Sequence, residues 1–213
     1  VLFHFRRCFV AVIAITNKKG GLGKTPIAVN TAKATDSIIL TNDDDVVEVV
    51  HGNTKVLPLK EIAELDFNAL PNTVIDFGGF VEAGTTSIIE RCDLVVVPVV
   101  NNISSLKRSI NAIDELSQLN KNIIIVATMT TDKSDLENIK TTFKDYKIKA
   151  FFELKKTELF NNSLNQGLGI EDYLDTNNIL RMAYGKKKNQ RTDSILEQWD
   201  NYITYVKKAI KGK

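Results

Sequence analysis

The sequence predicts an α/β fold in which helices cover both faces of a mostly parallel β-sheet. Short β-branched runs recur between helical stretches, an alternation that is typical of a parallel sheet with crossover helices. Most of these runs are continuously apolar rather than alternating, as expected for strands that are buried on both faces. With 213 residues, of which 43% are hydrophobic and 25% charged, the chain has the composition of a globular protein with a sizeable core.

Strands are expected in six segments, because each is a short apolar or β-branched run. They are Val10–Thr16, Ser37–Thr41, Thr73–Asp76, Asp93–Val100, Ile123–Thr128 and Lys149–Leu154. Between and after these strands, seven segments have the residue pattern of helices. They are Lys24–Thr35, Leu59–Ala69, Ala83–Arg91, Ser104–Asn120, Ser134–Tyr146, Glu158–Gln166 and Asp193–Ile210.

We interpret residues 10–213 as a single domain, because the chain contains no internal repeat and no linker rich in Pro, Gly or Ser. In this interpretation residues 1–9 are an N-terminal extension, and residues 181–213 are a basic C-terminal helical region. That region holds nine Lys or Arg and three acids, a net charge of +6, whereas residues 1–180 sum to −4. The basic charge is therefore concentrated at the C-terminal end.

The sequence argues against several classes of protein. Two cysteines, Cys8 and Cys92, cannot form a disulfide framework or the paired ligands of an iron–sulfur cluster within one subunit. No apolar run approaches the roughly eighteen residues of a membrane-spanning helix. Arg6-Arg7 and the apolar run that ends at Ile15 imitate a short signal peptide, but a small-residue cleavage site is missing. We therefore expect a buried strand there.

A glycine-rich loop directly follows the first predicted strand and leads into a helix that begins near Lys24. Glycines let backbone N–H groups converge on phosphate oxygens, and the N-terminus of the helix adds partial positive charge. Lys24 can reach the β- and γ-phosphates, and Thr25 can ligate Mg²⁺. This context predicts a fold like that of the P-loop NTPases. The loop residues expected to bind nucleotide are Lys18, Lys19, Gly20, Gly21, Leu22, Gly23, Lys24, Thr25 and Pro26.

Lys19–Thr25, with the sequence Lys-Gly-Gly-Leu-Gly-Lys-Thr, resembles the deviant Walker A motif of the ParA/MinD ATPases. Thr41-Asn42-Asp43 stands in the place of the family's Asp-x-Asp, and Val74–Gly79 resembles its Walker B strand and second switch. Cys92–Val99 and Phe160–Ile170 are similar to two later segments of the family. No helix-turn-helix region precedes the first predicted strand, so the resemblance is to the short plasmid-partition ParA proteins.

The resemblance implies a slow, partner-stimulated ATP hydrolase that acts in plasmid or chromosome partition. Mg-ATP would drive formation of a sandwich homodimer, in which Lys19 reaches the partner's phosphates. The dimer would bind DNA without sequence specificity, and hydrolysis would release it. A ParB-like centromere-binding protein would stimulate that hydrolysis, and the protein would be cytoplasmic and associated with the nucleoid.

Acidic residues at strand ends are the expected partners of the triphosphate. Asp76 ends a strand and would hold Mg²⁺ together with Thr25, Asp76 acting through water. Gly79 would approach the γ-phosphate with its N–H group. Asp43 matches the family's aspartate that positions the attacking water, so the expected catalytic residues are Asp43, Lys19 and Lys24.

The segment around Asp43 departs from the family pattern. Thr41 replaces the first aspartate, and Asp44-Asp45 replace the usual Pro-Gln. Three successive acids near a triphosphate should weaken binding unless Mg²⁺ lies among them. Two alternatives follow: the acids form a solvent-facing turn, or the protein is a nucleotide-binding scaffold with little turnover.

The nucleotide base is expected near Thr128 and Met129, where the family holds adenine. ATP is favoured over GTP because the Asn-Lys-x-Asp motif of GTPases is absent from this place, and Thr131-Asp132-Lys133 does not reproduce it. A second loop that contacts the base could include Glu153 and Leu154.

The C-terminal region offers a phosphate-neutralising surface for duplex DNA. Its alternative is an ordinary solvated face. The last predicted helix carries one apolar stripe, which is interpreted as a packing surface on the sheet, with a membrane-binding helix of the MinD kind as the alternative. The residues expected to bind DNA are Lys186, Lys187, Lys188, Arg191, Lys207 and Lys208.

Overall fold

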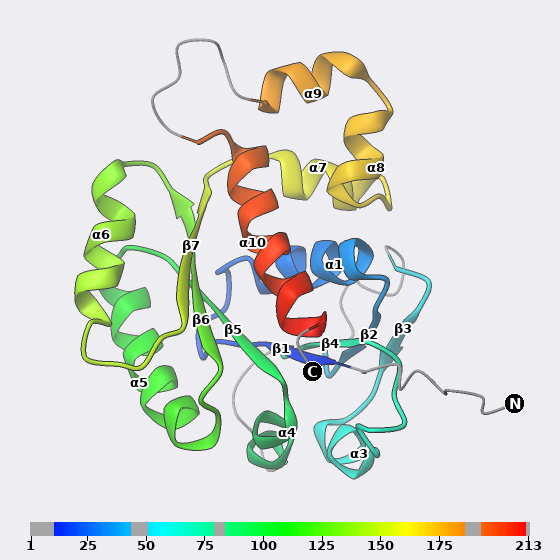
Figure 1. Ribbon diagram of the computed structural model, residues 1–213, viewed down its shortest axis with the longest axis vertical. Coiled ribbons are helices and arrows are strands. Elements are labelled where there is room, and N and C mark those ends of the chain that lie inside the picture. The colour runs from blue at the N-terminus through cyan, green and yellow to red at the C-terminus, as the bar shows by residue number, and fades with distance from the viewer. Residues whose placement is uncertain (1–10, 44–50, 79–83, 186–192, 212–213) are drawn as a thin grey trace, which may run out of the picture.

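The protein is described by a computed structural model, which covers residues 11–43, 51–78, 84–185 and 193–211. Its strands are β1 (Val12–Ile15), β2 (Ile38–Thr41), β3 (Thr54–Val56), β4 (Thr73–Asp76), β5 (Leu94–Val99), β6 (Ile123–Thr130) and β7 (Ala150–Lys155). They form one sheet in the order β3-β2-β4-β1-β5-β6-β7 (Figure 1). Every neighbouring pair is parallel, which confirms the predicted parallel sheet.

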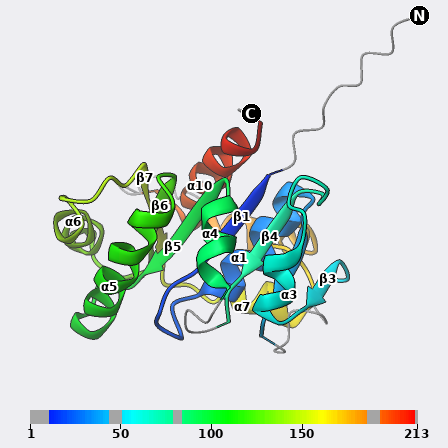
Figure 2. The same ribbon diagram turned by 90° about the horizontal axis from the view of Figure 1, so that it is seen from below.

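Helices cover both faces of this sheet, as the alternation of elements predicted (Figures 1 and 2). They are α1 (Lys24–Thr35), α3 (Leu59–Glu64), α4 (Thr85–Arg91), α5 (Ile103–Leu119), α6 (Lys133–Thr142), α7 (Leu159–Asn165), α8 (Ile170–Asp175), α9 (Asn178–Tyr184) and α10 (Ile195–Lys211).

Two hydrophobic cores lie on opposite faces of the sheet. Within β1, Ile13 and Ile15 belong to the core shared with α1, α7, α8 and α10, whereas Val12 and Ala14 belong to the core shared with α3, α4, α5 and α6. This division follows from the alternation of side chains along a strand. Because both faces are covered, the strand needs apolar residues at every position, and this is the continuous pattern seen in the sequence.

Three short elements were not predicted. Strand β3 has only three residues at one edge of the sheet, too few to show a strand pattern. Helices α8 and α9 have six and seven residues and lie between the predicted helices Glu158–Gln166 and Asp193–Ile210. Helix α9 begins where the Asn177 side chain accepts a hydrogen bond from the Ile179 N–H group, so a local cap rather than a long periodic pattern defines it.

Two predicted helices are shorter in the structure. Helix α3 ends at Glu64 rather than Ala69, because Leu65 is extended and the Asp66 side chain accepts a hydrogen bond from the Asn68 N–H group in a turn. Helix α6 ends at Thr142, four residues before the predicted end at Tyr146. In both cases the apolar pattern continues beyond the last helical residue.

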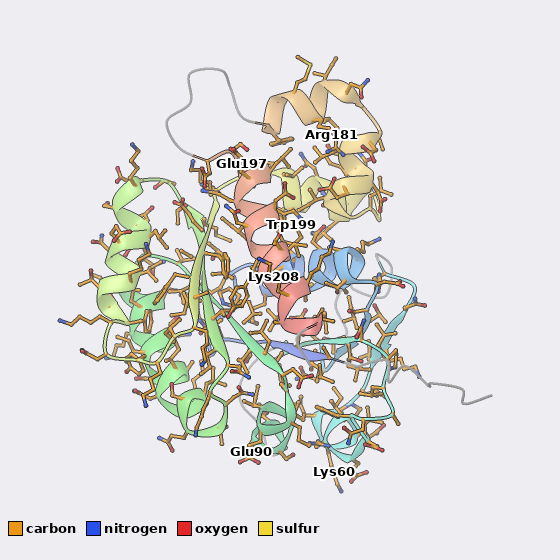
Figure 3. All side chains as sticks on the ribbon, viewed as in Figure 1. Lys60, Glu90, Arg181, Glu197, Trp199 and Lys208 are labelled. Carbon is orange, nitrogen blue, oxygen red and sulfur yellow. The ribbon has the colours of Figure 1, made fainter. Side chains whose placement is uncertain are left out.

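Helix α10 packs its apolar stripe on the protein, which confirms the packing interpretation. Trp199, labelled in Figure 3, and Tyr202 are 2% and 0% exposed. The centroid of the Trp199 ring lies 5.5 Å from that of the Phe160 ring of α7. The Tyr202 hydroxyl lies 3.0 Å from the Thr31 hydroxyl of α1, at hydrogen-bond distance. Among the described helices, none is both long enough and apolar enough to span a bilayer.

Changes at Tyr202 should separate the packing of α10 from its buried hydrogen bond. Tyr202→Phe removes only the bond to Thr31 and should lower the free energy of unfolding by about 1 kcal/mol. Tyr202→Ala also leaves a cavity and should cost about 3–5 kcal/mol. Urea denaturation followed by the fluorescence of Trp199, the only tryptophan of the chain, measures both. A Tyr202→Ala cost below about 1 kcal/mol would show that α10 does not pack as described.

Candidate nucleotide-binding site

The glycine-rich loop connects β1 to α1, and this strand–loop–helix context confirms the one predicted from the sequence. Strand β1 ends at Ile15, and α1 begins at Lys24. Gly21 and Gly23 have φ values of 72° and 81°, in the left-handed region that favours glycine. The backbone can therefore turn tightly and present the N-terminus of α1, with its partial positive charge, at the loop.

A buried asparagine anchors the start of this loop. Asn17 is 1% exposed, and its Nδ2 atom donates hydrogen bonds to the Pro98 carbonyl oxygen at 2.7 Å and to the Ser109 hydroxyl at 2.8 Å. Its Oδ1 atom accepts a hydrogen bond from the Lys19 N–H group at 3.2 Å. Asn17 thus ties the loop to β5 and α5. The sequence analysis did not identify Asn17. A polar residue directly after a buried strand was the only signal for its role, because its partners are far away in the sequence.

The side chain of Lys24 folds back across the loop. It is 8% exposed, and its Nζ atom donates a hydrogen bond to the Lys19 carbonyl oxygen at 3.1 Å. Burial lowers the pKa of Lys24, while the nearby carboxylates of Asp76 and Asp43 partly offset this effect. The ammonium group is therefore held at the loop with two acidic side chains close by.

Asp76, at the end of β4, is the most unusual polar group of the site. It is 0% exposed, and among the described residues neither carboxylate oxygen has a hydrogen-bond partner of normal geometry. Burial raises its pKa from 3.8 to about 6, and Asp43 adds to this rise, whereas the Thr25 hydroxyl and the Lys24 ammonium oppose it. Two unsatisfied carboxylate oxygens near a hydroxyl are the kind of donor set that Mg²⁺ prefers. The site therefore fits this cation.

Thr41 and Asp43 lie beside Asp76. Thr41 is 0% exposed and is the register partner of Asp76 between β2 and β4. Its hydroxyl accepts a hydrogen bond from the Asp43 N–H group at 3.1 Å. The structure thus brings Asp43 close to Asp76 and Lys24. Asp44 and Asp45 lie outside the described residues, so the predicted acidic turn is not described in full.

The two lysines that open the loop have different partners. The Lys19 Nζ atom lies 3.5 Å from the Ser104 hydroxyl at the start of α5, next to Ile103, which is 89% exposed. Lys18 instead forms an ion pair with Glu115 of α5. Lys18 was predicted to bind nucleotide, and this remains a prediction. Its ammonium group already has a protein partner in this structure.

A pocket of about 140 Å³ adjoins the other side of the loop. Its walls include Pro26, Leu154 and Phe160, and the predicted base-binding residues Thr128 and Met129 both line it. The Thr128 hydroxyl donates a hydrogen bond to the Leu22 carbonyl oxygen at 3.0 Å, so this side chain also supports the loop. Met129 has a φ of 56° at an irregularity of β6 and is 44% exposed.

The structure places some of the remaining predicted residues, namely those of the second base-contacting loop and two of those expected to bind DNA. Leu154 lines the pocket, but the Glu153 carboxylate accepts hydrogen bonds from Thr130 and Gln198 and is not part of its lining. Lys207 and Lys208 are exposed on α10, and Figure 3 labels Lys208. The other predicted residues lie outside those that the structure describes: Gly79, Lys186, Lys187, Lys188 and Arg191.

Asp76→Asn should change how stability depends on pH in the metal-free protein. The pKa of Asp76 is about 6 in the folded protein and near 3.8 in the unfolded chain, so the folded state binds a proton between these values. The Asp76 contribution therefore makes the protein most stable below about pH 4 and lowers stability by about 3 kcal/mol as pH rises to 6 and above. Asn cannot ionise and should abolish this decline.

Urea denaturation from pH 4 to pH 8 measures this difference between the variant and the wild type. Asp145→Asn, at an exposed aspartate, is the matched control and should follow the wild-type profile. Parallel stability profiles for Asp76→Asn and the wild type would contradict the description of Asp76 as a buried ionisable group.

Comparison with known proteins supports the fold. No protein-family model and no curated protein matches the sequence, but solved structures do. The cell division ATPase MinD of Pyrococcus furiosus gives a TM-score of 0.65 at 13% identity, over 93% of this chain and 98% of that chain. The septum site-determining protein MinD of Pyrococcus horikoshii, complexed with Mg-ADP, gives 0.64 at 14% identity, over 79% and 90%.

A ParA family ATPase from Chlorobium tepidum gives a TM-score of 0.55 at 14% identity, over 80% of this chain and 95% of that chain. At such identities the likeness concerns the fold. This likeness in fold agrees with the P-loop architecture that the glycine-rich loop predicted. The resemblance of Lys19–Thr25 to a deviant Walker A motif implied the same architecture. We conclude that this chain has the fold of the MinD and ParA ATPases.

Proposed function

We propose that the protein is a Mg-ATP-dependent ATPase of the ParA kind. The observation that carries this proposal is the buried Asp76 carboxylate, which has no hydrogen-bond partner of normal geometry among the described residues and lies with Lys24 and Thr25 at a glycine-rich loop. A buried carboxylate without partners is costly unless a ligand compensates for it. The Pyrococcus horikoshii structure holds Mg-ADP on the same fold, which supports a nucleotide and Mg²⁺ as that ligand.

Each loop residue has a distinct role in this proposal. The backbone N–H groups of Gly20–Gly23 and the N-terminus of α1 would bind the phosphates, and Lys24 would neutralise the β- and γ-phosphates. Thr25 and Asp76 would hold Mg²⁺, Asp76 through water; the bound metal would offset the charge of the phosphates. Asp43 would orient the attacking water for in-line hydrolysis. The base would lie against the apolar walls of the pocket beside Thr128 and Met129.

Dimerisation with ATP is the second part of the proposal. Lys19 lies at the loop beside the start of α5, where Ile103 is almost fully exposed. A second copy of the chain that faced this surface would cover Ile103 and bring its own phosphates to Lys19. Covering the Ile103 side chain in this way would remove its apolar surface from water and so favour association.

Partition by non-specific DNA binding is the proposed biological role, with a ParB-like protein as the stimulating partner. Lys207 and Lys208 are exposed on α10, and the sequence carries four more basic residues at 186–188 and 191. A positive surface of this kind binds duplex DNA through its phosphates. The apolar stripe of α10 is buried, which speaks against the MinD-like alternative in which this helix enters a membrane.

The nucleotide chemistry can be tested with three lysine variants. Lys24→Ala should abolish Mg-ATP binding in calorimetry, because it removes the charge buried at the loop. Lys19→Ala should retain binding but lower the ATPase rate at least about tenfold and abolish ATP-dependent dimerisation. Lys140→Ala is the matched control: its ammonium pairs with Glu137 on α6, away from the loop, so binding and dimerisation should persist.

Three results would revise this proposal. A folded wild-type protein that ignored Mg-ATP would overturn it. Mg-ATP binding without any phosphate release would instead favour the nucleotide-binding scaffold. Equal effects of the Lys140 and Lys19 variants would remove the argument for a cross-subunit lysine.

The DNA surface can be tested by charge reversal. Co-sedimentation with duplex DNA should require ATP and should weaken steeply with salt. The double variant Lys207→Glu/Lys208→Glu should reduce retention, and its plot of log K against log salt should be less steep by about 1 for each phosphate that it no longer neutralises. Lys60→Glu, on α3 across the sheet, is the control (Figure 3). Equal retention with and without ATP, or ATP-dependent binding to anionic liposomes instead, would contradict the partition role.

A further inference from the structure

The ends of β2 and β4 are joined beyond their last paired residues. Thr41 and Asp76 are register partners and are the last residues of β2 and β4. Continued by two residues beyond the end of each strand, the same register places Asp43 opposite Gly78. Here a side chain makes the connection: the Asn42 Oδ1 atom accepts a hydrogen bond from the Gly78 N–H group at 2.9 Å. The bond connects segments that are 36 positions apart in the sequence. We call this bond the Asn42–Gly78 clasp.

Asp43 lies unusually close to Gly78. Gly78 belongs to the two residues that directly follow β4, which we call the β4 segment. A Cβ atom added to Gly78 would overlap the Asp43 Cβ atom and lie 2.5 Å from its Oδ2 atom. Real Cβ atoms do not make such contacts, so Asp43 occupies the space that any larger residue at position 78 would need. The Asp43 backbone is fixed as well, because its N–H group donates to the Thr41 hydroxyl. The position of Asp43 thus depends on Thr41, Asn42 and Gly78.

We propose that Asn42 is a positioning residue of the ATPase site, which holds the β4 segment against Asp43 and so fixes the carboxylate that orients the attacking water. This inference rests on the proposed function, since it assigns that water to Asp43. Asn42 itself touches neither the phosphate loop nor Asp76 in any hydrogen bond that the structure describes. Its role is exerted through Gly78 and Asp43.

An asparagine suits this position for electrostatic reasons. The Gly78 N–H group is a single donor, and the side-chain oxygen of Asn42 is its acceptor. An aspartate would also accept this bond, but it would add a carboxylate beside Asp43, close to Asp76, whose charged form burial already disfavours. Asn42 supplies the oxygen without the charge.

The clasp can first be tested without nucleotide. In the full-length protein, hydrogen exchange of the Gly78 amide, followed by NMR, should become at least about tenfold faster in Asn42→Ala, because the amide loses its acceptor. Asn42→Asp retains an acceptor oxygen and should restore slow exchange. Asn177→Ala is the matched control: it removes an equivalent bond, from the Ile179 N–H group to an asparagine Oδ1 atom, on α9. It should leave Gly78 exchange unchanged.

The kinetic consequence separates positioning from binding. Asn42→Ala should lower kcat about tenfold while the KM for Mg-ATP stays within about twofold, because the loop that binds the phosphates is intact. Asn42→Asp keeps the acceptor oxygen but adds a carboxylate beside Asp43, so it should recover kcat only in part, to about threefold below the wild type. Gly78→Ala, which displaces Asp43 from the opposite side, should lower kcat to a similar extent, and the fluorescence of Trp199 would verify that each variant folds.

The outcomes decide between the proposals. Wild-type exchange rates at Gly78 in Asn42→Ala would overturn the clasp, whatever the ATPase activity. Faster exchange with unchanged kcat, or a raised KM with unchanged kcat, would overturn the positioning role. A wild-type protein without ATPase activity would refute the proposed function and with it this role, while the exchange rates would still show whether the clasp exists.

Discussion

The burial of one carboxylate constrains the whole site. Asp76 has no exposed surface and no hydrogen-bond partner of normal geometry among the described residues. Leaving an ionised carboxylate in such a place is unfavourable, which is why its pKa is raised. The register of the sheet creates this situation: Asp76 pairs with Ile15 on β1 and with Thr41 on β2, so three strand ends meet around it. A cation whose bound water molecules can donate hydrogen bonds would compensate for the buried carboxylate.

The core shared by α1, α7, α8 and α10 keeps the glycine-rich loop in place from behind. Helix α1 begins at the loop, and its buried polar residues bond to the C-terminal third of the chain. The Asn30 Oδ1 atom accepts a hydrogen bond from the Ile170 N–H group at 2.8 Å, and Thr31 bonds to Tyr202. Lys33 donates to the Gly167 carbonyl oxygen at 3.0 Å. The short helices and α10 therefore orient the helix whose N-terminus follows the glycine-rich loop.

The sequence predicted the parts of the site that are encoded locally. The continuous apolar runs identified the buried strands, and the glycines and lysines of the loop identified the turn between β1 and α1. Asp76 could be predicted because it directly ends such a run. Asn17 and Asn42 could not, because their importance comes from partners such as Pro98 and Gly78, which become neighbours only through the strand order. Short elements such as β3 and α9 escaped for a different reason: local caps and edge pairing define them, and neither leaves a periodic pattern.

The strand order has a consequence for how the molecule acquires its site. Strand β1 carries the loop, but its neighbours are β4 and β5, which come about 60 and 80 residues later in the chain. Such non-local pairings close large loops and form slowly. During synthesis, β1 cannot gain both of its neighbours until the segment up to Val99 has left the ribosome. The sheet that supports the glycine-rich loop is therefore completed late, and no N-terminal fragment shorter than this is expected to form it.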